Sequence, residues 1–215
     1  MVFNLEEIHK KSESSDPYER RESVCQLRRE FSSLPDKQKA WEELIKFTAD
    51  EDSVVRHWAV QELGKTFQQI PEKQKAWEDL HRLTLDEDSF LRHWAAEALG
   101  KAFQQIPEKQ KAWEDLHRLA ADEYGVVRLW AAEALGEAFQ QIPEKQKAWE
   151  DLIKLTDDEY SGVRFWAAHA LENAFQQTPG KQKAWEDLQR LTLDEDDEVR
   201  GKAREAVEKE SQIPV

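Results

Sequence analysis

The strongest constraint on the fold is a segment that returns every 36 residues along the chain. Each copy opens with a version of PEKQKAWEDL, and an arginine and an aspartate further on keep the same step. The opening prolines are Pro35, Pro71, Pro107, Pro143 and Pro179. A fixed period of this length indicates repeats that cannot bury an apolar face alone and therefore stack on their neighbours.

Residues 1–34 are a divergent first copy, so six repeats account for the whole chain. Stepping back by one period places Arg20 under Arg56 and Phe31 under Phe67. The repeats are then 1–34 as an amino-terminal cap, 35–70, 71–106, 107–142, 143–178, and 179–215 as a carboxy-terminal cap. No linker interrupts them, and we therefore expect a single repeat domain over residues 1–215.

Within one repeat the pattern predicts two helices. A proline followed by glutamate favours the start of the first helix. Its apolar residues recur at intervals of three and four, as on one buried face; in one copy these are Ala112, Trp113, Leu116 and Leu119. The stretch DEDS supplies turn and N-cap side chains for a second helix, which we expect to run to about Gln105. Six stacked helical hairpins make an all-α protein, an α-solenoid.

The stretch DEYGVVRLWAAEALG, from Asp122 to Gly136, resembles the HEAT repeat and especially its short HEAT-like, PBS-lyase-type relatives. The shared pattern is an aspartate, an arginine preceded by valine or leucine, and then Ala-Ala and Ala-Leu-Gly. The resemblance implies a right-handed superhelix with the second helices on its concave side, an Asp–Arg ladder between repeats, and a role in binding or scaffolding. The tetratricopeptide repeat is the alternative, but its period is about 34 residues and it lacks the Val-Arg element.

The formal net charge of −14 restricts the choice of partner. Nucleic acids and anionic membrane surfaces need a basic face, so we expect neither and favour a protein or peptide with basic or apolar character. Cys25 is the only cysteine, which excludes an internal disulfide and a cysteine-rich zinc site. The first residues lack the pattern of a signal peptide, and both end repeats are polar. We therefore expect a cytoplasmic monomer.

No set of residues in the sequence has the pattern of a catalytic site, and we expect no metal and no other cofactor. His57 and His93 fall on successive second helices, whose axes lie about 8 to 10 Å apart, too far for one zinc ion. HEAT-like hydroxylases imply a di-iron site built on His-Glu dipeptides, which are absent here. HEAT-like DNA glycosylases imply a basic groove. The first hypothesis is a non-catalytic scaffold, and the alternative is a HEAT-like enzyme or accessory, such as a lyase or a glycosylase-like protein.

Positions that differ between copies mark a candidate binding surface. On a helical wheel His93 falls opposite the apolar arc, and the next two repeats hold Leu129 and Phe165 there, so we expect these side chains to be exposed. An apolar centre with an acidic margin suits an apolar residue flanked by basic ones. The predicted partner-binding residues are Tyr124, Leu129, Glu133, Glu137, Tyr160, Phe165 and His169. The alternative is that these are scattered surface residues without a binding role.

Four tryptophans at the border of the apolar arc admit two interpretations. They are Trp58, Trp94, Trp130 and Trp166, and the end repeats hold Glu22 and Lys202 instead. The indoles either pack between neighbouring hairpins or form an aromatic stripe that grips a ligand or peptide, and both can hold in part. The Asp and Arg columns predict a structural ladder, with a polyvalent charged site as the alternative. Gly64, Gly100 and Gly136 predict close helix contact or a bend.

Overall fold

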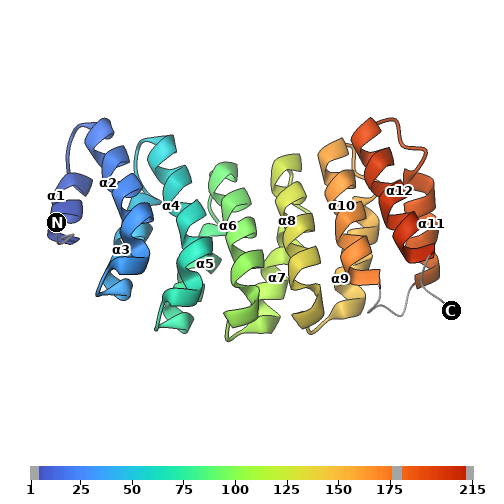
Figure 1. The fold of residues 1–215 in the computed structure, drawn as a ribbon, viewed down its shortest axis with the longest axis horizontal. Helices are drawn as coiled ribbons and strands as arrows, with labels where there is room; N and C mark the ends of the chain where they lie inside the picture. The colour runs from blue at the N-terminus through green and yellow to red at the C-terminus, as the bar shows by residue number, and fades with distance from the viewer. Residues whose placement is uncertain (1–4, 176–180, 212–215) are drawn as a thin grey trace. The chain divides into compact units, whose positions relative to one another are not determined.

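The computed structural model describes residues 5–175 and 181–211, and its secondary structure is helical. The chain divides into two compact halves, Met1–Pro107 and Glu108–Val215, each with three helical hairpins (Figure 1). The first half holds α1 (Leu5–Ser12), α2 (Pro17–Glu30), α3 (Lys37–Phe47), α4 (Ser53–Thr66), α5 (Lys73–Leu83) and α6 (Ser89–Ala102). The second holds α7 (Lys109–Leu119), α8 (Gly125–Ala138), α9 (Lys145–Leu155), α10 (Ser161–Ala174), α11 (Lys181–Leu191) and α12 (Asp197–Ser211). The predicted all-α hairpins are confirmed.

The first helix of a hairpin begins later than the prolines predicted. In the third repeat Pro71 precedes the N-cap residue Glu72, and α5 starts at Lys73. The reason is a local contact: Lys73 Nζ donates to the carbonyl of Phe67, 2.6 Å away, and lies over its ring. Phe67 opens a short 3₁₀ turn, Phe67–Gln69, that ends the preceding helix. The lysine thus satisfies a carbonyl at a helix end, where backbone acceptors lack partners within the helix.

The tryptophans of the QKAWEDL segment belong to the core of the first-helix layer. Trp41 and Trp149 are fully buried, and the ring of Trp41 meets the ring of Phe67 edge-on with centroids 5.9 Å apart. Trp41 also donates its Nε1–H to Asp79 of the next repeat at 2.9 Å. Because a buried carboxylate needs hydrogen-bond donors, this bond helps to explain an aspartate in an otherwise apolar layer.

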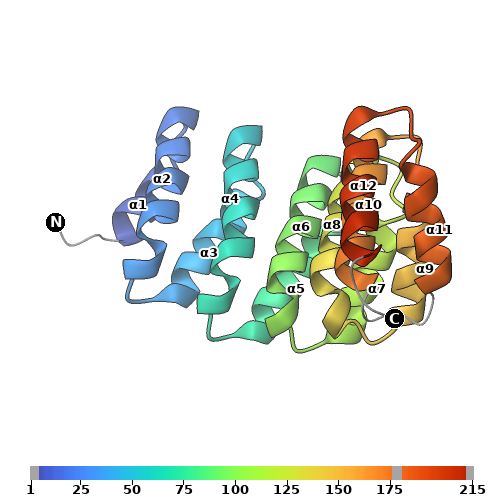
Figure 2. The ribbon, with the colours of Figure 1, turned by 45° about the vertical axis from the view of Figure 1, so that its right-hand side comes forward.

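The second helices pack against one another within each half, α4 on α6 and α8 on α10 (Figures 1 and 2). The approach is close because two glycines face alanines. A Cβ atom on Gly64 would lie 2.8 Å from the Cα of Ala98, and one on Gly136 would lie 2.7 Å from the Cβ of Ala170. The predicted role of Gly64 and Gly136 in close helix contact is confirmed.

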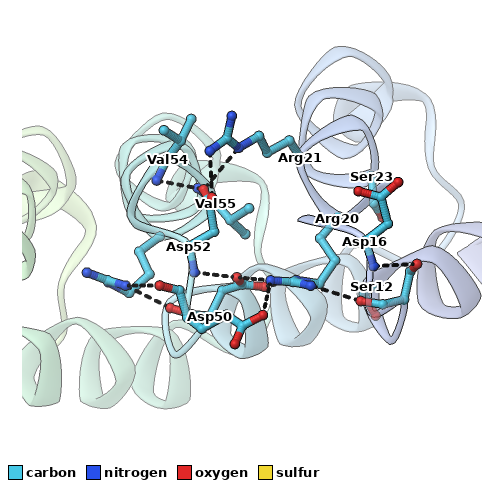
Figure 3. A network of polar contacts seen from close by, with 12 residues as sticks. Ser12, Asp16, Arg20, Arg21, Ser23, Asp50, Asp52, Val54 and Val55 are labelled. Atoms are coloured by element: carbon cyan, nitrogen blue, oxygen red, sulfur yellow. Dashed lines mark hydrogen bonds and ion pairs between the residues drawn. The ribbon is translucent and has the colours of Figure 1, made fainter. Parts of the chain in front are cut away.

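The predicted ladder of aspartates and arginines is present in both halves. Arg20 Nε donates to Asp50 at 2.8 Å, and its Nη2 donates to the other carboxylate oxygen of the same residue (Figure 3). The same two-bond pairs join Arg128 to Asp158 and Arg164 to Asp194. Arg56 departs from the pattern, because only its Nη2 reaches a carboxylate, that of Asp88 at 3.0 Å.

Candidate binding surfaces

The second helices α8 and α10 begin differently from α4, α6 and α12, the last of which starts with Asp196 accepting from the backbone N–H groups of Glu198 and Val199. Asp52 caps α4 by accepting from the backbone N–H groups of Val54 and Val55 (Figure 3), and Asp88 caps α6 by accepting from the backbone N–H of Phe90. Tyr124 and Tyr160 occupy the N-cap positions of α8 and α10, where a phenol makes no capping hydrogen bond. Their exposed fractions are 51% and 49%. An aromatic side chain therefore stands where aspartate would have satisfied the helix end.

Two glycines make room for these aromatic and apolar groups at the start of α8 and α10. A Cβ atom on Gly125 would lie 3.2 Å from the ring of Tyr160, and one on Gly162 would lie 2.9 Å from Leu129 Cδ1. Leu129 therefore lies over the first turn of α10, and Tyr160 lies over the first turn of α8. The structure brings these two predicted residues to the same junction between the helices.

The expectation that Leu129 and Phe165 are exposed is wrong in degree, because both side chains are half-buried. Leu129 is covered in part by the next helix. The ring of Phe165 lies edge-on to that of Trp166, with centroids 5.5 Å apart. Trp166 in turn contacts the ring of His169 at 5.3 Å. Phe165 and His169 thus form a second cluster on α10, in which the indole of Trp166 contacts both rings. Leu129 belongs to the other group, at the junction of α8 and α10.

The acidic residues of the predicted surface differ in exposure. Glu137 is exposed and Glu133 is half-buried on α8, and Glu159 beside Tyr160 is almost fully exposed. Burial, followed by the charge of Lys202, lowers the pKa of His169, so this imidazole is neutral at pH 7. The surface of α8 and α10 therefore combines neutral aromatic rings with carboxylates.

The tryptophan column is half-buried at all four positions, Trp58, Trp94, Trp130 and Trp166. In the first half, Trp94 packs edge-on against His57 with centroids 4.3 Å apart, which joins α6 to α4. Trp58 and Trp94 also line an open space between α4 and α6. Both earlier interpretations, packing and an aromatic stripe, are therefore compatible with the geometry.

A cleft between α4 and α6 was not predicted from the sequence. It has a volume of about 420 Å³ and is lined by Ser53, Val54, Arg56, His57, Trp58, Phe90, Leu91 and Trp94. Phe90 lines the cleft and is itself 68% exposed. The equivalent positions hold Tyr18, Val54, Val126, Gly162 and Glu198, so the available signal was that Phe90 is the one aromatic residue at this position among the four inner repeats.

The prediction that His93 is exposed is wrong: only 6% of the residue is accessible. The rings of Phe90 and Trp94 lie against it, with centroid separations of 5.5 and 4.7 Å. This burial lowers the pKa of His93 to about 4. A helical wheel gives only the angle of each side chain, so it omits the cover that the large rings of Phe90 and Trp94, on the same helix, give to the smaller imidazole.

In residues 5–175 and 181–211, no three His, Cys, Asp or Glu side chains converge in a way that could hold a metal ion. Over the same ranges, no helix combines the length and apolar character needed to cross a bilayer.

A family model described as HEAT repeats matches residues 5–100, 41–136 and 114–208. Among solved structures, an engineered protein is similar over 96% of both chains, with 25% identity and a TM-score of 0.65. A designed armadillo repeat protein solved in complex with the peptide (KR)4 has 23% identity and a TM-score of 0.70, covering 96% of this chain and 99% of that one. The Escherichia coli protein YibA has 22% identity and a TM-score of 0.66, covering 95% of this chain and 70% of that one. No curated protein sequence matches significantly.

Proposed function

Because this chain belongs to the HEAT repeat family, we propose that it is a non-catalytic cytoplasmic scaffold that binds a protein or peptide along its second helices. The observation that carries the proposal is the replacement of capping aspartates by Tyr124 and Tyr160. Loss of an N-cap costs about 1 kcal/mol. A half-exposed aromatic ring at a helix start offers contact area to a partner in return, and tyrosine is among the residues that dominate binding energy at interfaces.

The chemistry of the surrounding residues favours a basic partner with an apolar anchor. Leu129, Tyr160 and Phe165 supply the apolar part, and the same two helices and the residue before Tyr160 carry the carboxylates of Glu133, Glu137 and Glu159. The designed armadillo protein that shares the fold was solved with a peptide of alternating lysine and arginine. The net charge of −14 favours the same class of partner and opposes nucleic acid and anionic membranes.

The double substitution Tyr124→Asp and Tyr160→Asp tests this proposal, because it separates binding from folding. The probe is a fluorescein-labelled peptide with one central phenylalanine flanked by lysine and arginine, titrated by fluorescence anisotropy at low salt. We expect the affinity to fall at least about tenfold, as for loss of one interface anchor. The new aspartates restore the N-caps, so the melting temperature should stay the same or rise.

Two controls make the result specific. Leu193→Asp removes another exposed apolar side chain, from the loop between α11 and α12, and should leave peptide affinity unchanged. A peptide with glutamate in place of the basic residues should not bind. Unchanged affinity in the tyrosine variant, or equal affinity for the acidic peptide, would contradict the proposal.

A further inference from the structure

The cleft between α4 and α6 is a second candidate site, in the other half of the chain and independent of the peptide surface. Its walls are aromatic: His57, Trp58, Phe90 and Trp94 supply four rings, and Val54 and Leu91 supply aliphatic groups. The volume of about 420 Å³ lies within the range of roughly 300 to 1,000 Å³ that small-molecule sites occupy. Size and lining therefore suit a compact aromatic molecule.

Arg56 is the one lining residue that carries a charge at neutral pH. His57 also lines the cleft, but burial, followed by the positive charge of Arg28, lowers its pKa, so its ring is neutral. A ligand that fills this cleft therefore meets aromatic faces and a single guanidinium group. Charge complementarity favours an anionic group on the ligand rather than a cationic one.

The guanidinium of Arg56 is engaged less completely than those of its counterparts. Arg128 and Arg164 each donate Nε–H and Nη2–H to one carboxylate. Arg56 donates Nη1–H to the carbonyls of Asp50 and Glu51 and Nη2–H to Asp88. Its Nε–H has no acceptor among the described residues. The ladder thus leaves one charged donor available where its arginine borders the aromatic cleft.

We propose that the cleft between α4 and α6 binds a small aromatic carboxylate, with the ring among His57, Trp58 and Trp94 and the carboxylate on Arg56. Ring stacking and edge contacts hold the aromatic group, as His57 and Trp94 already hold each other. A carboxylate accepting from Nε–H forms a charge-assisted hydrogen bond, which is stronger than a neutral one.

A free molecule fits this site better than the carboxyl-terminal residue of a peptide. All the lining residues belong to α4 and α6, whose backbone groups bond within the helix or to its cap, so the cleft offers no row of free backbone groups to pair with a peptide chain. Recognition of a peptide end also uses main-chain hydrogen bonds to the preceding residues. The ligand that fits is therefore a small molecule with one aromatic ring system, single or fused, and a short side chain that carries the carboxylate.

Isothermal titration of the full chain with indole-3-acetate tests the proposal, and indole-3-acetamide is the matched neutral probe. We expect saturable binding of the acid and at least tenfold weaker binding of the amide. Arg56→Gln should reduce affinity for the acid about tenfold and leave affinity for the amide unchanged. Arg29→Gln removes an exposed arginine of the same half and should change neither.

A second variant protects the test against loss of fold. Phe90→Ala shortens a wall residue that is 68% exposed and should weaken both probes. The circular dichroism spectrum should stay the same and the melting temperature should fall only slightly, because the ring of Trp94 still covers His93. Equal affinity for acid and amide, or full affinity in both variants, would overturn the proposal. A short peptide ending in tryptophan that binds while indole-3-acetate does not would also overturn it, and would assign the cleft to a chain terminus.

Discussion

At the scale of single residues, neighbours in space decide the environment of a side chain more than its angle on a helical wheel does. His93 occupies a position that is polar by helical phase, yet the rings of Phe90 and Trp94 bury it. Leu129, at the equivalent position one repeat later, is only half-buried. The sequence identified this column as the one where copies differ. It could not show which copies are covered, because that depends on side chains of the same and adjacent helices.

The burial of His93 predicts a stability that is sensitive to acid. Its pKa is about 4 in the folded chain and near 6.5 when unfolded, so between these values the unfolded state binds more protons. Stability is therefore complete above about pH 6.5 and is lost as the pH falls toward 4. His93→Leu introduces the residue that the next repeat has at this position, and its stability should fall by about 2 kcal/mol less than that of the parent between pH 7 and about pH 5.

Urea unfolding followed by circular dichroism at both pH values measures this difference. The comparison cancels the titration of carboxylates, which both chains share. Parallel loss of stability in parent and variant would show that His93 is charged or accessible in the folded state.

At the scale of elements, the hairpins were predictable because apolar spacing and N-cap chemistry act locally. The ends of α6 and its 3₁₀ extension agree with the predicted limit near Gln105. The starts of the first helices were predicted too early, because the contact of Lys73 with the Phe67 carbonyl joins residues on both sides of the proline. Close packing of α4 on α6 was predictable from Gly64, but its partner Ala98 was not.

The close contact between α4 and α6 predicts that two glycine substitutions change the stability of the chain in opposite directions. Gly64→Ala gains helix propensity, but its Cβ would lie 2.8 Å from backbone of α6, so we expect a net loss of about 1 to 3 kcal/mol. Gly201→Ala in α12 meets no atom within 4 Å and should stabilise by up to about 1 kcal/mol. Urea midpoints of the two variants provide the measurement. A stabilised Gly64→Ala chain would mean that α4 and α6 stand further apart.

At the scale of the whole molecule, the period of 36 residues predicted the number of hairpins and the cross-repeat ladder. Both follow from equivalent residues meeting equivalent neighbours in successive repeats. The candidate sites were less predictable, since they arise where the repeats stop being equivalent. The tyrosines at the starts of α8 and α10 were visible in the sequence, whereas the cleft of the first half required the positions of rings from two helices.

The ladder predicts unequal costs for removing equivalent arginines. The side chains of Arg164 and Asp194 are 9% and 8% exposed, whereas those of Arg56 and Asp88 are 23% and 28% exposed. Arg164→Met leaves a buried carboxylate without its two-bond partner and should cost on the order of 3 kcal/mol. Arg56→Met should cost clearly less, because Asp88 keeps contact with water and its capping bond. Equal shifts in the urea midpoint would contradict this ranking.

The ladder also affects how the number of repeats in such a chain can change during evolution. In three of its steps an arginine meets the aspartate that lies 30 residues further along, so the contact depends on what the following repeat carries and not on where in the chain it stands. Duplication or loss of one whole repeat within a gene regenerates the same pairing at the new junction. Inheritance can therefore lengthen or shorten the array without new compensating mutations at that contact, while single codons at the helix starts remain free to diversify.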